Sequence, residues 1–155
     1  MRNYAEVFTD GSCHTQHCTG AWASLIFIDG QRFTLSGVEK NTAHNRMEIL
    51  SVINAIEYIK QHYPIITDIS IVSDSQYVIG LVERERKFIT QQYKTKAGKE
   101  IRNIDLVKHL LKLNTDLSLQ FIKIKAHQKQ SSEPNYNIEA DKLCRKLVRE
   151  AISTC

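Results

Sequence analysis

The sequence predicts an α/β protein built on one five-stranded mixed sheet with helices on both faces. The apolar patterns indicate the order strand, strand, strand, helix, strand, helix, helix, strand, helix. An antiparallel meander followed by strand–helix–strand units is typical of a mixed sheet whose helices cover its faces. No repeat, low-complexity tract or linker divides residues 1–155, so the whole chain is expected to form a single domain.

The first three strands follow from alternation and turn chemistry. Residues Tyr4–Asp10 alternate between apolar and polar side chains and meet Gly11, which predicts a strand that ends in a turn. The apolar run Ala21–Asp29 predicts a second strand. The dipeptide Asp29-Gly30 is a hairpin signal, so Gln31–Gly37 is expected to return antiparallel to the second strand.

A helix is expected from about Ala43 to Tyr63, because its apolar residues recur at helical spacing and Pro64 stops it. The run Asp68–Asp74 predicts a fourth strand. The segment Ser75–Tyr93 is helical in pattern, and Gly80 predicts a break within it.

The last elements are a helix, a strand and a helix. Asn103–Leu113 has a helical apolar stripe, and Ser118–His127 has strand character with lysines that indicate a solvated face. A polar loop, Gln128–Asn135, leads to the final helix from about Tyr136 to Ile152.

Positive charge is concentrated in one segment. The stretch from Arg84 to Arg102 has seven basic and two acidic residues, a net charge of +5 in a chain whose net charge is +4. A local basic patch on an otherwise nearly neutral chain favours a polyanionic partner. A solvated helix face laced with ion pairs would show the same composition, and charge alone leaves both interpretations open.

Composition bears on location and on metal type. No apolar run approaches the roughly 18 residues of a membrane span, and the N-terminus lacks a secretory apolar region, so no membrane partner and a cytoplasmic location are expected. The four cysteines are then expected to be reduced thiols. The stretch "CHTQHC", residues 13–18, lacks zinc-finger spacing and a second ligand pair, which disfavours zinc.

Four acidic residues stand at positions that a sheet edge could bring together. Asp10 and Asp74 end predicted strands, and such sheets form sites at the carboxyl ends of parallel strands. Glu48 and Asp141 lie on the rims of the apolar stripes of their helices. Each acid alone could be a turn, cap or rim residue. Together they would repel one another unless cations neutralise them, and hard oxygen ligands select Mg²⁺ or Mn²⁺.

The stretches "FTDGSC", "HNRMEIL" and "SDSQYV" and the helix of Asp141 occur in the order and spacing of type 1 ribonuclease H. The chain resembles that family over essentially its whole length. The resemblance implies the RNase H-like fold and two-metal hydrolysis of the RNA strand of RNA–DNA hybrids, which leaves 5′-phosphate and 3′-hydroxyl ends. It implies two Mg²⁺ ions, with Mn²⁺ possible, bound by catalytic acids at Asp10, Glu48, Asp74 and Asp141, and a mobile catalytic histidine at His127.

The residues expected to contact the substrate are predicted partly from helix chemistry and partly from the resemblance. The expected N-terminus of the first helix is a natural phosphate site and carries Asn41, Thr42, His44 and Asn45. The resemblance adds the amides of Asn45 and Gln76, the residues Gly11, Ser12, Cys13 and Gln16 beside the RNA strand, and a basic protrusion with Arg84, Arg86 and Lys87. Phe88 and Tyr93 are the aromatic residues nearest to the positions of the family's tryptophans.

The chain departs from the family in two loops. "CHTQHCTG" replaces a Gly/Pro-rich loop and places Gln16 where the family commonly has asparagine, and the loop after His127 is longer than in typical bacterial members. Two alternatives remain: an RNase H domain of a reverse transcriptase polyprotein, and a non-catalytic module that binds hybrids. The principal expectation is a stand-alone monomeric enzyme with no obligate protein partner.

Overall fold

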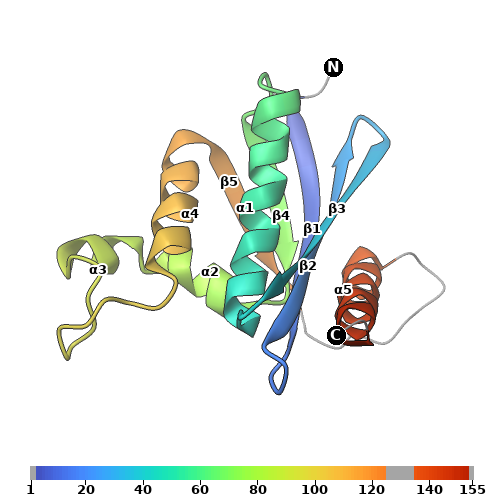
Figure 1. The fold of residues 1–155 in the computed structure, drawn as a ribbon. Helices are drawn as coiled ribbons and strands as arrows, with labels where there is room; N and C mark the ends of the chain where they lie inside the picture. Colours follow the sequence, from blue (N-terminus) through green and yellow to red (C-terminus); the bar gives the residue numbers. More distant parts are fainter. Residues whose placement is uncertain (1–2, 125–134, 154–155) are drawn as a thin grey trace.

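The computed structural model describes residues 3–124 and 135–153, which form one sheet with helices on its two faces (Figure 1). The strand order is β3-β2-β1-β4-β5. Antiparallel pairing joins β1, β2 and β3, and parallel pairing joins β1 to β4 and β4 to β5. The strands are β1 (Tyr4–His14), β2 (Thr19–Ile28), β3 (Gln31–Lys40), β4 (Asp68–Ser73) and β5 (Ser118–Lys123).

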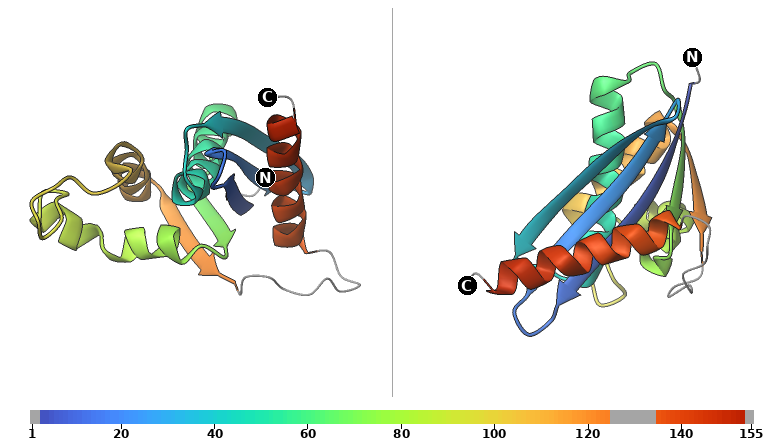
Figure 2. Two further views of the ribbon diagram at one scale, coloured as in Figure 1. Left: turned by 60° about the horizontal axis from the view of Figure 1, so that its bottom comes forward. Right: turned by 90° about the vertical axis from the view of Figure 1, so that its right-hand side faces the viewer.

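The helices fall on opposite sides of the sheet, as Figures 1 and 2 show, with α1 and α4 on one face and α5 on the other. No helix in the described part of the chain is long and apolar enough to cross a membrane. The helices are α1 (His44–His62), α2 (Gln76–Glu83), α3 (Glu85–Thr90), α4 (Ile104–Asp116) and α5 (Tyr136–Ser153).

Two apolar clusters hold these layers together. The larger one buries the predicted stripe of α1 against the sheet and α4. The smaller one packs Ala21 and Ala23 of β2 against Ala140, Cys144 and Val148 of α5. The predicted mixed sheet with helices on both faces is therefore confirmed.

The helical segment after β4 breaks at a different residue from the one predicted. Gly80 lies inside α2, so the predicted break near Gly80 is wrong. The chain turns at Arg84 (φ −101°, ψ 13°), whose backbone N–H is shared between the carbonyls of Gly80 and Leu81. Burial of Val78 and Leu81 on one side of α2 keeps this stretch helical despite the low helix propensity of glycine.

The parallel strands β1 and β4 separate where the site forms. Their last paired residues are Phe8 and Val72, while β1 continues beside β2 as far as His14. Asp10 and Asp74 each lie two residues beyond this last pair. They therefore face one another across an opening at the carboxyl end of the parallel pairing, the usual position of a site in such sheets. The turn predicted at Gly11 is wrong, because β1 continues through Gly11 to His14.

Candidate active site

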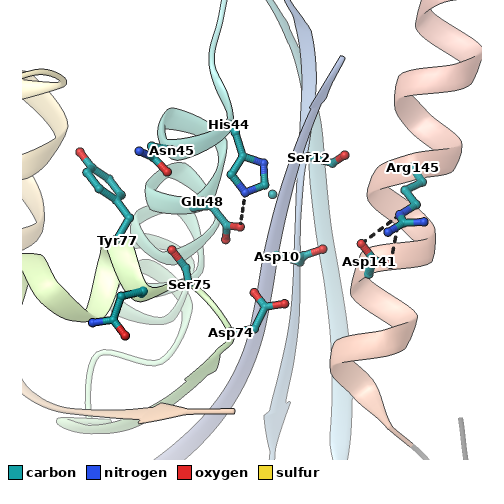
Figure 3. A pocket seen from close by; sticks show the side chains of 12 residues that line it. Asp10, Ser12, His44, Asn45, Glu48, Asp74, Ser75, Tyr77, Asp141 and Arg145 are labelled. Carbon is teal, nitrogen blue, oxygen red and sulfur yellow. Dashed lines mark hydrogen bonds and ion pairs between the residues drawn. The ribbon is translucent and has the colours of Figure 1, made fainter. Parts of the chain in front are cut away.

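Three acidic side chains converge at this opening. One carboxylate oxygen from each of Asp10, Glu48 and Asp74 lies within 4.8 Å of the others. Asp10 and Glu48 are buried, and Asp74 is partly exposed. Figure 3 shows the three side chains around one pocket, Asp10 on β1, Glu48 on α1 and Asp74 just after β4. The structure thus places three of the four predicted acids together at one sheet edge.

Gly11 explains how a helical residue reaches a site between strands. A Cβ atom at Gly11 would lie 2.5 Å from the backbone nitrogen of Glu48 and 2.6 Å from the carbonyl carbon of Met47. Real Cβ atoms do not approach backbone atoms so closely. Only glycine therefore lets the first turn of α1 press against β1, and this contact brings Glu48 to the opening.

Burial and the charges of neighbouring acids disfavour the ionised forms of Asp10 and Glu48 in the absence of a cation. Burial, followed by the charges of Glu48, Asp74 and Asp141, raises the pKa of Asp10 to about 9. Burial also raises the pKa of Glu48, against the opposing effect of a hydrogen bond with His44, whose Nε2 lies 3.1 Å from Oε1 of Glu48. That hydrogen bond, in turn, is the main cause of a raised pKa of His44.

The donor set fits a hard divalent cation. Oε2 of Glu48 is buried and has no hydrogen-bond partner among the described residues. An unpaired buried carboxylate oxygen is costly unless a cation or a donor satisfies it. Carboxylate oxygens alone, without a cysteine or histidine in the group, suit Mg²⁺ or Mn²⁺ better than zinc.

Asp141 stands on the far side of the same pocket. It lies on α5, outside the group of three, and forms an ion pair with Arg145, whose Nε lies 3.2 Å from Oδ2. Its charge still contributes to the raised pKa of Asp10, and its position across from Asp10 is visible in Figure 3. The structure therefore brings all four predicted acids to one pocket.

That pocket has a volume of about 380 Å³. Nine of the residues predicted from the sequence line it, together with three that were not predicted: Ser75, Tyr77 and Arg145. Arg145 follows Asp141 at a spacing of four residues, and this helical ion-pair spacing was the available signal. The predicted lining residues are Asp10, Gly11, Ser12, His44, Asn45, Glu48, Asp74, Gln76 and Asp141.

A second pocket of about 440 Å³ adjoins the first at the N-terminus of α1. It shares His44, Asn45 and Tyr77 with the acidic pocket. It adds Arg102, the last residue of the predicted basic segment, and Asn103, which sequence reasoning did not select. Asn103 has a left-handed backbone (φ 57°) at the start of α4, and its amide donates to the hydroxyl of Tyr77. This juxtaposition depends on tertiary packing and leaves no local signal in the sequence.

Other predicted substrate residues lie outside both pockets. The thiol of Cys13 donates to the backbone oxygen of Thr42, which ties the end of β1 to the loop before α1. Gln16 is exposed in the turn between β1 and β2, and Asn41 has a left-handed backbone (φ 53°). His127 lies outside the described residues, so its predicted role stays a prediction.

The basic segment is built on a stacked aromatic pair. The rings of Phe88 and Tyr93 are nearly parallel with centroids 6.2 Å apart. The guanidinium of Arg84 lies 5.2 Å from the centroid of Phe88, and the ammonium of Lys108 lies 5.0 Å from that of Tyr93. Phe88 is only 9% exposed, so in this structure it supports the cation above it.

A mixed sheet of this topology, with four carboxylates around a pocket at the separation of two parallel strands, is typical of a metal-dependent hydrolase. The family model described as RNase H matches residues 2–149. The chain therefore belongs to the RNase H family, as the sequence motifs predicted.

Individual relatives support the same family assignment. The chain is 30% identical to a protein named Ribonuclease H from Chlorobaculum parvum, over 97% of this chain and 99% of the relative. It is 33% identical to a Ribonuclease H from Wolbachia pipientis, over 94% of this chain and 95% of the relative. The solved structure of LC9-RNase H1, described as a type 1 RNase H with the type 2 active-site motif, has the same fold. Its TM-score is 0.77 at 20% identity, and the match covers 95% of this chain and 72% of that one.

Proposed function

We propose that this chain cleaves the RNA strand of RNA–DNA hybrids with two bound Mg²⁺ ions, for which Mn²⁺ can substitute, and leaves 5′-phosphate and 3′-hydroxyl ends. The observation that carries the proposal is the convergence of three carboxylates within 4.8 Å in a member of the RNase H family. Divalent cations bound at such a site supply an activated water and stabilise the charge that develops on the leaving oxygen.

The chain's own residues would hold these ions and keep the acids in place. Asp10, Glu48 and Asp74 form the principal ligand group, and Asp141 adds a carboxylate from the opposite wall of the pocket. His44 positions Glu48 through their hydrogen bond and leaves the second oxygen of Glu48 without a protein partner. The proposed role of His127 is to carry a proton or to aid product release, since histidine titrates near neutral pH.

Contacts to the hybrid follow from the polar groups that rim the pocket. Ser12, Asn45 and Gln76 line it and can hydrogen-bond a nucleic acid strand held over the acids. The ammonium of Lys123 donates to Oε1 of Gln76 at 2.6 Å, so the amide nitrogen of Gln76 remains available as a donor. We propose that such groups read the 2′-hydroxyl of the RNA strand.

We also propose that the enzyme acts as a monomer in the cytoplasm without an obligate protein partner. One chain supplies all four carboxylates of the pocket. The described thiols of Cys13, Cys18 and Cys144 are free, which is consistent with a reducing compartment.

The first prediction concerns the choice of strand. With Mg²⁺, the chain should cleave the RNA strand of a labelled RNA–DNA hybrid and leave double-stranded DNA of the same sequence intact, because DNA lacks the 2′-hydroxyl. Gel analysis of both substrates with Mg²⁺ and with EDTA checks this. Comparable cleavage of double-stranded DNA would contradict the strand choice. Tight hybrid binding without cleavage would instead support the non-catalytic module.

The second prediction concerns the basic segment. Arg84, Arg86 and Lys87 form no ion pair with any acidic side chain in the described part of the chain, which favours a polyanion over a solvated, internally paired face. Changing all three to alanine should weaken hybrid binding on every base sequence. It should also flatten the fall of log affinity with log salt, by up to about 0.9 per lost phosphate contact on a B-DNA scale.

Binding titrations at several salt concentrations measure both quantities. A variant with Lys60 and Lys112 changed to alanine removes exposed charges from the far ends of α1 and α4 and serves as the control. If the triple variant kept the salt slope of the parent chain, the basic segment would not contact phosphates.

A further inference from the structure

A second group of basic residues lies on α5, away from the segment Arg84 to Arg102. Its exposed side carries four cations that recur at intervals of three and four residues, while the opposite side is buried against β2. Side chains at this spacing share one side of a helix. The four residues are Lys142, Arg145, Lys146 and Arg149.

Arg145 connects this side of α5 to the acidic pocket. Among the described residues that line the pocket it is the only lysine or arginine, and it pairs with Asp141 there. Figure 3 shows its guanidinium beside Asp141 at the wall formed by α5. A fixed positive charge at the edge of four carboxylates is suited to the phosphate group of a substrate that must approach them.

Arg149 extends this charge outward from the pocket. It lies one helical turn beyond Arg145, about 6 Å farther along the axis. It is exposed, and no acidic side chain of residues 3–124 or 135–153 forms an ion pair with it. Lys142 is three residues before Arg145 and lies on the same side of the helix. We call Lys142, Arg145 and Arg149 the α5 basic face.

Lys146 is different. It points about 100° away from Arg145 around the helix axis, but it stays on the same side of α5 as Lys142 and Arg149. Its ammonium lies 4.0 Å from a carboxylate oxygen of Glu150, one turn later. This is the arrangement of a solvated helix surface, and it contributes little to stability or binding. Lys146 thus offers a control on the same helix.

The position of α5 relative to the other basic segment indicates a role for this face. Figure 2 shows α3 and the following loop projecting on one side of the molecule, with α5 on the other side of the sheet. The four carboxylates between them repel a polyanion. Cations on α5 and on the segment Arg84 to Arg102 offset that repulsion. Their contacts with phosphates are the kind that supply most of the non-specific affinity of nucleic acid binding.

We propose that the α5 basic face binds backbone phosphates of the RNA strand where the hybrid runs past the acidic pocket. This inference rests on the proposed function and deepens it by assigning a second electrostatic contact surface. Lys142 and Arg149 are about 10 Å apart along the helix axis, a length that spans about three nucleotides of one strand. The contact is indifferent to base sequence.

The test uses the full chain with Asp10→Asn, so that bound hybrid persists. Adding Lys142→Gln and Arg149→Gln should lower the affinity for a hybrid of about 20 base pairs by about fivefold to tenfold per lost contact near 0.1 M salt, and should flatten the salt slope by up to about 0.9 per contact. Glutamine retains helix propensity, so the helix itself is preserved. Lys146→Gln in the same background removes a cation that already pairs with Glu150, so it should change both quantities less than the double variant does.

A second arm locates the contact. Hybrids are prepared in which only the RNA strand is shortened, at one end or the other, so that it stops at the pocket. One of the two shortened hybrids lacks the RNA phosphates that face α5. The parent and the double variant should bind that hybrid with equal affinity. A difference that persists for both shortened hybrids would overturn the proposal, as would equal binding of the long hybrid by the parent and the double variant.

The two proposals fail separately. If the unmodified chain did not cleave hybrids in Mg²⁺, that result would count against the proposed function alone. If cleavage were intact and the α5 variants bound like their parent, that result would count against this inference alone.

Discussion

Replacing Asp10 with asparagine is expected to lower the rate of hybrid cleavage by about 10³-fold or more, the largest effect on activity that we expect from a single isosteric change. Asp10 is one of the two buried acids in the group formed with Glu48 and Asp74. Losing its charge weakens cation binding, and bound cations provide several kcal/mol of transition-state stabilisation, at about 1.4 kcal/mol per tenfold in rate. Single-turnover cleavage of a labelled hybrid in Mg²⁺ measures the loss.

Asp68→Asn is the matched control, because it makes the same chemical change at an exposed residue at the opposite end of β4. It should retain the activity of the unmodified chain. Normal cleavage by Asp10→Asn in Mg²⁺ would remove the basis for assigning the carboxylates to metal binding.

The same substitution should change the pH dependence of stability in the absence of metal. The pKa of Asp10 in the folded chain is about 9, raised from 3.8 mainly by burial. Between about pH 4 and pH 9 the folded state therefore holds a proton that the unfolded state has released, so the contribution of Asp10 to stability falls as pH rises. Asparagine does not ionise. Thermal unfolding in EDTA should show a weaker fall of Tm with pH for the variant, and identical pH profiles would contradict this account.

Gly11→Ala is expected to have the largest effect on stability together with loss of activity. The added methyl group would overlap backbone atoms of Met47 and Glu48, and neither can move without displacing the start of α1 from β1. Such overpacking typically costs about 1–3 kcal/mol. Because the same displacement moves Glu48 away from Asp10, cleavage should fall by more than the loss of folded protein explains.

Chemical denaturation and single-turnover cleavage test the two effects, and Gly80→Ala is the control. Gly80 lies inside α2, and the nearest atom to an added Cβ would be 3.7 Å away, at the end of the flexible side chain of Arg84. Alanine there should be neutral or stabilise the chain by about 0.5–1 kcal/mol, since it favours the helix. An unchanged free energy of unfolding for Gly11→Ala would show that α1 and β1 are not in the tight contact described.

Many of the local features were predictable from the sequence because they follow from periodicity and turn chemistry. Alternation in β1, the Asp29-Gly30 turn and the apolar stripe of α1 each lie within a short stretch of chain. The break in the helix after β4 was predicted at the wrong residue, because that prediction also used local sequence alone. Propensity points to Gly80, but burial of Val78 and Leu81 against the rest of the protein outweighs it.

The four acids were predictable as a group from residue type and order, and their motifs identified the family. The geometry of the four acids was not predictable from the sequence. The distance between Asp10 and Glu48 depends on how closely α1 approaches Gly11, and the distance between Asp10 and Asp74 depends on where β1 and β4 separate. Both are properties of packing between segments that are far apart in the chain.

The sequence by itself determined the fold class, the identity of the acids and the concentration of charge between Arg84 and Arg102. Only the tertiary structure decided that Arg145 reaches the pocket beside Asp141, and that Asn103 joins His44 and Asn45 in the adjoining one. The physical reason is that hydrophobic periodicity specifies which face of each element is buried, whereas contacts across the sheet arise only when register, helix packing and close approaches such as that at Gly11 are satisfied together.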